Sequence, residues 1–469
     1  MGAIYESKRG GIAAVRNKGK GKGAKNILSL FPKSAERRAP IGLRFMKTTD
    51  RGGRALQKKR WKDTFDRKRK MKITVVCDVY GRENNGSDIV ASNLVNYLRE
   101  AGHEVRVLCA DQTKIGVPEH YVVPNLSLGK PLNAYVSKVG VAFAKPDREI
   151  IRAAFEGVEI VHIMLPLPLG LAAVNVAREM GIPVTAGFHM QAENLTSHLK
   201  LTRFGRVNRF VYRFIHKHLY RYCDAIHFPT TFIRGAFERA IGRKTPGWVI
   251  SNGVHSYVKK REIAKPEQFE DKIVILTTGR YATEKSQDTL IKAVARSRHR
   301  EEIQLILGGE GPKEKRYKRL AAKLPIPPIF KFYSRKEIID VLNCADIYVH
   351  PAQIELEGIA CIEAIACGKL TIVSDSAKSA TRGFAVDERC VFRSRDPKDL
   401  ARVIDYWIEH PEEKAICEEK YLRSAVAFDQ EECMQRMEEM ILGVLEERRR
   451  SAAVEAGSEE VKTGSKKKK

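Results

Sequence analysis

The chain has 469 residues, 43% of them hydrophobic, so it is long enough for two domains of ordinary size, each with its own core. No run of about 18 apolar residues occurs, and the basic N-terminus lacks the apolar core of a signal peptide, so we expect neither a transmembrane helix nor secretion. The nine cysteines stand singly and no CxxC pair occurs, which predicts reduced thiols and no zinc site.

The formal net charge of +27 is concentrated at the two ends of the chain. Residues 1–70 carry +17 and residues 446–469 carry +3; neither segment is periodic, so we predict a basic disordered arm and a charged disordered tail. Such an arm could bind nucleic acid or an anionic membrane. Alternatively, translation starts at Met71, where MKITVVCDVY is typical of the opening strand of an α/β domain.

From Met71 onward, short apolar runs alternate with helical patterns, the first of which covers residues 88–100. The first strands are expected at 73–77, 105–108, 160–163 and 184–188. This alternation predicts a parallel sheet with helices on both faces. We therefore expect a first Rossmann-like domain at 71–255.

A second alternating series follows a charged linker at 256–268. Its strands are expected at 273–277, 304–307, 329–332, 347–350 and 370–373. The intervening helical patterns predict a second Rossmann-like domain at 269–408. Residues 409–445 are then expected to form terminal helices that cross back toward the first domain.

Two carboxylates, Glu355 and Glu363, stand eight positions apart around a turn of small residues. The preceding strand ends at His350 and a helix is expected from Gly358, so Glu355 lies in the connecting loop and Glu363 about one turn inside the helix. Open α/β sheets bind ligands at the carboxyl ends of their strands. Acids there that accept hydrogen bonds from sugar hydroxyls suit a nucleotide-sugar site; the alternative is a solvated acidic loop.

Three other segments are expected at the same edge of a sheet. Arg280 and Lys285 flank the turn after strand 273–277, and such a pair of cations suits a diphosphate. The glycines of residues 308–312 permit close approach of a ligand but equally make an ordinary turn. Gly86 precedes a helix whose N-terminus could bind phosphate, but one glycine is no GxGxxG fingerprint, so NAD has little support.

In combination these motifs resemble those of the retaining family 4 glycosyltransferases, which have the GT-B fold. The resemblance covers Met71 to about Leu445, and its motifs stand in the family's order and spacing: Asn85-Gly86, Ala101-Gly102-His103-Glu104-Val105, Phe188-His189, Ser251-Asn252-Gly253-Val254, Gly279-Arg280 with Glu284-Lys285, Gly308-Gly309-Glu310-Gly311-Pro312, and Glu355 with Glu363. It implies an α/β fold with two Rossmann-like, doubly wound parallel-sheet domains facing a central cleft. The first domain would bind the acceptor and the second the nucleotide-sugar donor.

The resemblance also implies a role for each matching residue. Arg280 and Lys285 would hold the donor diphosphate and stabilise the leaving group as negative charge develops. Glu363 would bind the ribose hydroxyls, Glu355 would contact the transferred sugar, and Gly86 would let the backbone approach the phosphates. The implied mechanism is front-face attack by the acceptor hydroxyl with the departing phosphate as base, so neither glutamate is a covalent nucleophile.

Some positions leave alternatives open. A second acid, Glu357, precedes Gly358, so Glu355 and Glu357 could exchange roles, and all three residues are candidates for donor binding. His189 ends a strand of the first domain and is expected near the sugar and the acceptor; the alternative is a capping or core histidine. No DxD-type motif is evident, so we expect no metal and no cofactor other than the UDP-sugar substrate, with the two cations of the donor loop in the metal's role.

The acceptor is expected to be a membrane lipid. The segments IELEGIACIEAIACG, SDSAKSATRGFAVDERCVF and FHMQAEN resemble bacterial enzymes that glucosylate diacylglycerol. Independently, residues 199–222 combine an apolar stripe at helical spacing with many cations and no acid, which is typical of helices that bind anionic interfaces. The cations expected at the membrane are Arg203, Arg206, Arg209, Arg213 and Lys217. Alternatively, the stripe packs on the domain core and the basic face is only solvated.

Together these expectations describe a retaining hexosyltransferase that moves glucose from UDP-glucose to 1,2-diacylglycerol, bound peripherally to the cytoplasmic face of the membrane. The alternatives are a soluble saccharide or protein acceptor, a UDP-GlcNAc 2-epimerase of the same fold, and a nucleic-acid-binding protein that uses the charged ends. Arg280 and Lys285 beside the acids argue against a glycosidase. We do not expect nucleic acid to be a partner.

Overall fold

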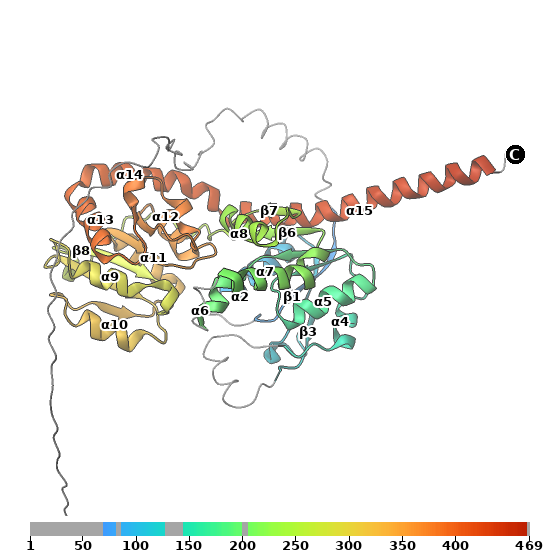
Figure 1. The fold of residues 1–469 in the computed structure, drawn as a ribbon, viewed down its shortest axis with the longest axis horizontal. Coiled ribbons are helices and arrows are strands. Elements are labelled where there is room, and N and C mark those ends of the chain that lie inside the picture. Colours follow the sequence, from blue (N-terminus) through green and yellow to red (C-terminus); the bar gives the residue numbers. More distant parts are fainter. Residues whose placement is uncertain (1–68, 81–85, 127–143, 199–204, 467–469) are drawn as a thin grey trace, which may run out of the picture. The chain divides into compact units, whose positions relative to one another are not determined.

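The computed structural model describes residues 69–80, 86–126, 144–198 and 205–466 (Figure 1). The basic arm predicted at 1–70 therefore lies outside the described residues, except for its last two positions. Asn85 and Arg203 lie outside them as well. The described strands form two separate parallel sheets.

The first sheet has seven strands in the order β3-β2-β1-β4-β5-β6-β7. The strands are β1 (Lys72–Cys77), β2 (Glu104–Cys109), β3 (His120–Val122), β4 (Ile160–Ile163), β5 (Val184–Gly187), β6 (Ala225–Phe228) and β7 (Gly247–Val249). Ile73 of β1 lies opposite Val105 of β2 on one side and Ile160 of β4 on the other. The chain order reverses at β1, which makes this a doubly wound sheet with its switch point between β1 and β4.

Helices cover the first sheet and close a core on each of its faces, since the consecutive residues Val75 and Val76 of β1 belong to different buried clusters. The helices are α2 (Gly86–Glu100), α4 (Arg148–Phe155), α5 (Pro168–Glu179), α6 (Ala192–His198), α7 (Gly205–His218) and α8 (Thr231–Ile241). The side chains of Asp147 and Thr230 accept backbone N–H bonds at the starts of α4 and α8, which fixes where these helices begin.

The second sheet has six strands in the order β10-β9-β8-β11-β12-β13. The strands are β8 (Ile273–Thr278), β9 (Ile303–Gly308), β10 (Ile329–Lys331), β11 (Ile347–His350), β12 (Leu370–Ser374) and β13 (Val391–Phe392). The associated helices are α9 (Gln287–Val294), α10 (Glu314–Ala321), α11 (Arg335–Cys344), α12 (Ile359–Ala366) and α13 (Pro397–Glu409). Chain order reverses between β8 and β11, so the switch point of this sheet lies there.

The strands that the sequence analysis named occur close to their expected bounds, but four observed strands were not predicted. β3 and β7 have three residues and β13 has two, which is too short to show alternation. β6 has four residues and is buried along its whole length.

Two terminal helices, α14 (Pro411–Ala425) and α15 (Gln430–Lys466), follow the second sheet. α14 packs on α12 and β12, where the hydroxyl of Tyr421 donates to the carbonyl oxygen of Thr371 at 2.6 Å. α15 packs instead on α2 and β6 of the first sheet, where its apolar side chains join the buried core: Met434, Met437, Met440, Ile441 and Leu445.

The chain passes between the two sheets once near residue 254 and again near residue 428, and the two passages are hydrogen bonded. The amide of Val254 donates to the carbonyl oxygen of Phe428 at 2.8 Å, and the amide of Gln430 donates back to Val254 at 3.1 Å. Because Val254 also belongs to the core of the second domain, both passages are anchored there.

The tail prediction for 446–469 is wrong over most of its length, because α15 continues to Lys466. Two arginines tie the helix to the first domain: Arg448 contacts Asp224 at 3.0 Å and Arg449 contacts Glu159 at 3.1 Å. Alanine and glutamate also favour the helical state in this segment. Within the described part of the chain, no helix is both long and apolar enough to cross a bilayer.

Candidate active site

Two loops that follow neighbouring strands of the second sheet carry most of the predicted donor-site residues. The β8–α9 loop contains Arg280 and Lys285, and the β11–α12 loop contains Glu355 and Glu357. Because β8 and β11 are adjacent at the switch point, both loops leave the same carboxyl edge of the sheet. This edge is where open α/β sheets bind ligands.

The loops bring the predicted cations and acids into direct contact. Lys285 Nζ forms a close ion pair with Glu355 Oε2, joining one loop to the other. Arg280 Nη2 contacts Glu284 Oε1 at 2.8 Å; the Glu284 carboxylate is buried, whereas the arginine side chain is 43% exposed. The amide of Gln353 donates to the carbonyl oxygen of Glu284 at 2.7 Å and ties the two loops at the backbone.

The backbone is strained directly after Lys285. Ser286 has a φ of +54°, a left-handed conformation that costs a non-glycine residue on the order of 1 kcal/mol or more. The residue is buried and its hydroxyl contacts the side chain of Gln353, so the surroundings hold it in place. Ser286 directly precedes Gln287, the first residue of α9, so the bend lies where the loop joins the helix.

Glu355 is held as an ionised acceptor. In addition to Lys285, the ring of His350 contacts Glu355 through Nε2 at 3.0 Å from Oε2. Burial by itself raises the pKa of the Glu355 carboxyl, but Lys285 and His350 outweigh burial and lower the pKa to about 2. The Glu355 carboxylate is therefore charged at every physiological pH.

Glu357 has different partners from Glu355, which separates the two acids that the sequence leaves interchangeable. Its carboxylate accepts hydrogen bonds from the hydroxyl of Ser251 at 2.6 Å and from the amide of Asn252 at 3.0 Å. Burial raises the pKa of Glu357 to about 7 despite these donors. Glu357 thus ties the β11–α12 loop to the passage between the sheets, while Glu355 is the acid beside Lys285.

Gly358 and Glu363 shape the start of α12. Gly358 has a φ of +92°, and a Cβ atom there would lie 2.6 Å from Thr381 Cγ2, so the turn requires glycine. Burial raises the pKa of Glu363 to about 7, although the positive charge of Arg335 opposes this shift. No described residue donates a hydrogen bond to the Glu363 carboxylate.

The glycine loop after β9 packs against the β8–α9 loop. Gly309 has a φ of +148°, and a Cβ atom there would lie 2.3 Å from the carbonyl oxygen of Gly279. The amide of Tyr281 donates to Glu310 at 2.7 Å across the same contact. The glycines in this loop therefore serve loop packing. At Gly86, the first residue of α2 in the first domain, a Cβ atom would meet no heavy atom of the described residues within 4 Å.

His189 lies two residues beyond β5 in the first domain. Its ring packs edge-on against His227 with 5.3 Å between the ring centroids. Burial, together with His227 and His162, lowers the pKa of His189 well below its ordinary value, so the ring is neutral. Its Nε2 atom is buried and has no hydrogen-bond partner among the described residues.

Of the helix predicted at 199–222, residues 199–204 lie outside the described residues; α7 covers Gly205–His218, and a 3-10 turn follows at Tyr220–Tyr222. The apolar stripe divides between two faces. Tyr212 and Ile215 are buried in the core of the first domain, but Phe210 is 67% exposed and Phe214 is 44% exposed. The cations on the exposed side of α7 are Arg206, Arg209, Arg213 and Lys217.

Three contacts at this site were not assigned by the sequence analysis. Glu284 lies within a quoted motif but was given no role, and its pairing with Arg280 follows the helical i,i+4 spacing, which was an available signal. His350 ends a predicted strand directly before the acidic loop, which is also a signal. The bond between Glu357 and Asn252 joins residues 105 positions apart, and no local pattern indicates it.

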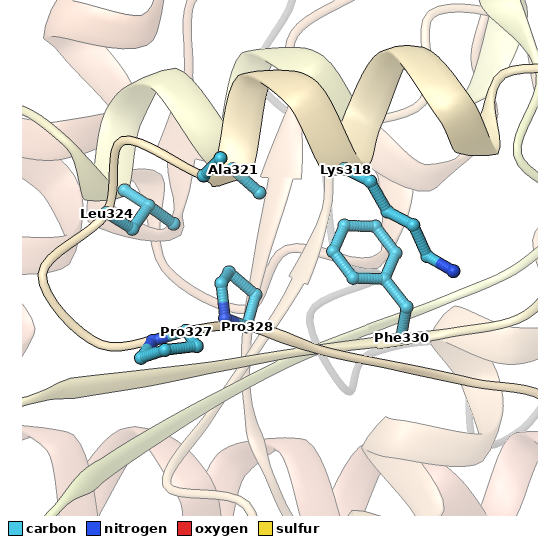
Figure 2. A pocket seen from close by; sticks show the side chains of 7 residues that line it. Lys318, Ala321, Leu324, Pro327, Pro328 and Phe330 are labelled. Atoms are coloured by element: carbon cyan, nitrogen blue, oxygen red, sulfur yellow. The ribbon is translucent and has the colours of Figure 1, made fainter.

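A cavity of about 410 Å³ lies elsewhere in the second domain, between α10 and β10. Figure 2 shows the side chains that line it, among them Lys318, Leu324, Pro327 and Phe330. This cavity shares no residue with the candidate active site.

Comparison with known protein families gives two matches that divide the chain between its two sheets. The model described as Glycosyltransferase Family 4 matches residues 84–256. The model described as Glycosyl transferases group 1 matches residues 258–422. Together the two matches cover nearly all of both sheets.

Individual proteins give weaker but consistent similarities. A GDP-mannose-dependent alpha-(1-6)-phosphatidylinositol dimannoside mannosyltransferase of Mycobacterium tuberculosis is 26% identical over 40% of this chain and 50% of its own length. The chain thus spans about half the length of this relative. The alpha-monoglucosyldiacylglycerol synthase of Streptococcus pneumoniae is 22% identical over 64% of this chain and 70% of its own length. The crystal structure of Anabaena HepE with UDP-glucose is 19% identical, has a TM-score of 0.61 and matches 80% of this chain and 100% of that one.

Proposed function

We propose that this chain, which belongs to the group 1 glycosyltransferases, transfers a hexose from a nucleotide-sugar to a membrane lipid with retention of configuration. The fold is GT-B, as predicted, with two Rossmann-like parallel-sheet domains. The donor proposed first is UDP-glucose and the acceptor proposed first is 1,2-diacylglycerol.

The observation that carries the proposal is the ion pair between Lys285 and Glu355 at the switch point of the second sheet, with Arg280 in the same loop as Lys285. In the proposed complex, Arg280 and Lys285 bind the diphosphate and neutralise the charge that develops on the leaving group. Glu355 accepts hydrogen bonds from the transferred sugar, and Glu363 accepts them from the ribose. The acceptor hydroxyl attacks from the face that the phosphate leaves, and its proton passes to that phosphate.

The same two cations support a reaction that needs no metal. Arg280 offers a planar fork of donors and Lys285 a mobile point charge, which together can neutralise a diphosphate as a divalent ion does in other enzymes. We therefore propose that chelation of divalent ions leaves the transfer rate unchanged.

The proposed acceptor is supported by α7 and by a relative. The exposed side of α7 combines Phe210 and Phe214 with cations, the composition of a helix that lies in an anionic interface. Lys217 and Arg213 continue the basic side toward the end of the helix. The name of the Streptococcus pneumoniae relative gives alpha-monoglucosyldiacylglycerol as the product of that enzyme. We accordingly propose peripheral binding at the cytoplasmic face of a membrane.

A second candidate donor is GDP-mannose. It is favoured by the Mycobacterium tuberculosis relative, whose name gives that donor and a phosphatidylinositol dimannoside acceptor. The roles proposed for Arg280 and Lys285 are the same with either donor, because both donors carry a diphosphate.

The proposal is tested by incubating the full chain with radiolabelled UDP-glucose or GDP-mannose and with vesicles of anionic phospholipid. The vesicles are prepared with and without diacylglycerol. Label in a glycolipid that requires both UDP-glucose and diacylglycerol, and that survives EDTA, is expected. Label only from GDP-mannose favours the second donor. A chain that labels no lipid from either donor contradicts the proposed function.

A further inference from the structure

His350 and Lys285 contact the same carboxylate oxygen of Glu355. Nε2 of His350 lies 3.0 Å from Oε2 of Glu355, and Nζ of Lys285 contacts the same oxygen. Under the proposed function, on which this inference rests, Lys285 turns to the donor diphosphate. Glu355 then keeps His350 as its described hydrogen-bond donor.

Behind His350 a line of hydrogen bonds runs back along the sheet. Nδ1 of His350 lies 3.3 Å from the hydroxyl of Tyr348, and that hydroxyl lies 3.0 Å from Oγ1 of Thr278. Tyr348 and His350 stand on the same face of β11, two residues apart, and Thr278 ends the adjacent strand β8. His350 and Tyr348 are buried, so water does not compete for these bonds.

The chemistry of the groups gives this line one direction. An ionised carboxylate can only accept, so His350 must carry its proton on Nε2. With that proton on Nε2, Nδ1 can accept the proton of the Tyr348 hydroxyl. The oxygen of Tyr348 in turn accepts from Thr278. Every donor in the line therefore points toward Glu355, and such bonds polarise one another in the same sense.

We propose that His350 is a positioning residue that keeps Glu355 charged and aimed at the transferred sugar after Lys285 has turned to the diphosphate. Tyr348 and Thr278 hold His350 in the tautomer that this task requires. A purely structural contact at the end of β11 would require only a side chain of suitable size at position 350.

The test compares two replacements of similar size in the full chain. His350→Gln keeps a nitrogen donor that can reach Glu355, whereas His350→Leu keeps bulk without a donor. For His350→Leu we expect kcat to fall about 10- to 100-fold, the scale of a lost hydrogen bond to a charged group. The acidic limb of the kcat profile should move to higher pH, because Glu355 is then easier to protonate. His350→Gln should keep the limb near its wild-type position.

Tyr348→Phe provides a second variant that removes one hydroxyl and little else. It should move the acidic limb in the same direction as His350→Leu, by less. Binding of UDP, which lacks the transferred hexose, should keep its wild-type Kd in all three variants, as followed by titration calorimetry.

The inference would be overturned if His350→Leu and His350→Gln had equal kcat values and equal pH profiles, whether normal or lowered. The proposed function would still stand in that case if the wild-type enzyme transfers the hexose to lipid. Loss of UDP binding in both would also overturn it, because position 350 would then be needed for the shape of the site. A wild-type chain without transfer activity contradicts the proposed function itself, and the inference with it.

Discussion

At the scale of single residues, the acids of the β11–α12 segment have different environments although they stand close together in the chain. Lys285 and His350 outweigh burial at Glu355 and lower its pKa to about 2. Burial prevails at Glu357 and Glu363 and raises each pKa to about 7. A ligand that donates hydrogen bonds to Glu363 would replace the hydration that burial removes.

The raised pKa of Glu363 predicts that donor binding depends on pH. Ribose hydroxyls bind an ionised carboxylate more strongly than a protonated one. With a pKa near 7, Glu363 is mostly protonated at pH 6 and mostly ionised at pH 8. UDP affinity should therefore rise up to about tenfold between these values, with a proton released on binding. Titration calorimetry in buffers of different ionisation enthalpy measures both effects.

Glu363→Gln is the control for this prediction, because the amide cannot titrate. The variant should bind UDP more weakly at pH 8 and should lose most of the pH dependence. If the variant keeps the full dependence, another group, such as Glu357, is responsible and the role given to Glu363 is wrong.

At the scale of elements, α7 has two faces of different character. Tyr212 and Ile215 anchor it in the first domain, while Phe210 and Phe214 face solvent beside the cations. The burial of one face explains how the helix keeps its place, and the exposure of the other face supports the proposed membrane contact.

Replacement of Arg206, Arg209 and Arg213 by Gln should weaken binding to anionic vesicles, since each cation near such a surface contributes about 1 kcal/mol. Vesicle co-sedimentation at low and high salt measures the change. The matched control replaces three exposed cations of the second domain, Lys315, Arg319 and Lys323, by Gln, and should bind as the wild type does. If the two triple variants bind equally, α7 is not the membrane contact.

The sequence predicts those helices and strands that are long enough to show a periodic or unbroken apolar pattern. Long buried strands such as β8 and β9 are marked by unbroken apolar runs, and the motif glycines place the loops. The length of α15 could not be predicted, because Arg448 and Arg449 are held by acids from distant parts of the chain. The sequence motifs indicate Lys285 and Glu355. The partners of Glu357 are distant in the chain and become its neighbours only when the chain folds.

At the scale of the whole molecule, α15 makes the last part of the chain a structural component of the first domain. His103 contacts Glu438 of α15 at 2.8 Å, and the same histidine accepts the amide of Met71 at 3.2 Å. The start of β1 and the terminal helix are thus joined through one buried ring. Loss of α15 should therefore expose the core of the first domain, although α15 follows the second domain in the chain.

Met440→Ala should therefore destabilise the first domain by about 2–5 kcal/mol, the usual cost of truncating a fully buried methionine. Denaturant unfolding followed by far-UV circular dichroism measures the loss. Glu447→Ala, an exposed position on the same helix, is the matched control and should leave the midpoint unchanged. A Met440→Ala midpoint equal to that of the control would contradict the packing of α15.

The central claim is that Lys285 and its partners form the donor site of a lipid hexosyltransferase. The most direct test compares glucose transfer into diacylglycerol vesicles by the wild-type chain, Lys285→Ala and the exposed control Lys315→Ala. We expect a normal rate for the control and a loss of about 100-fold or more for Lys285→Ala, the scale of a lost charge-stabilising group. Near-normal transfer by folded Lys285→Ala would contradict the claim.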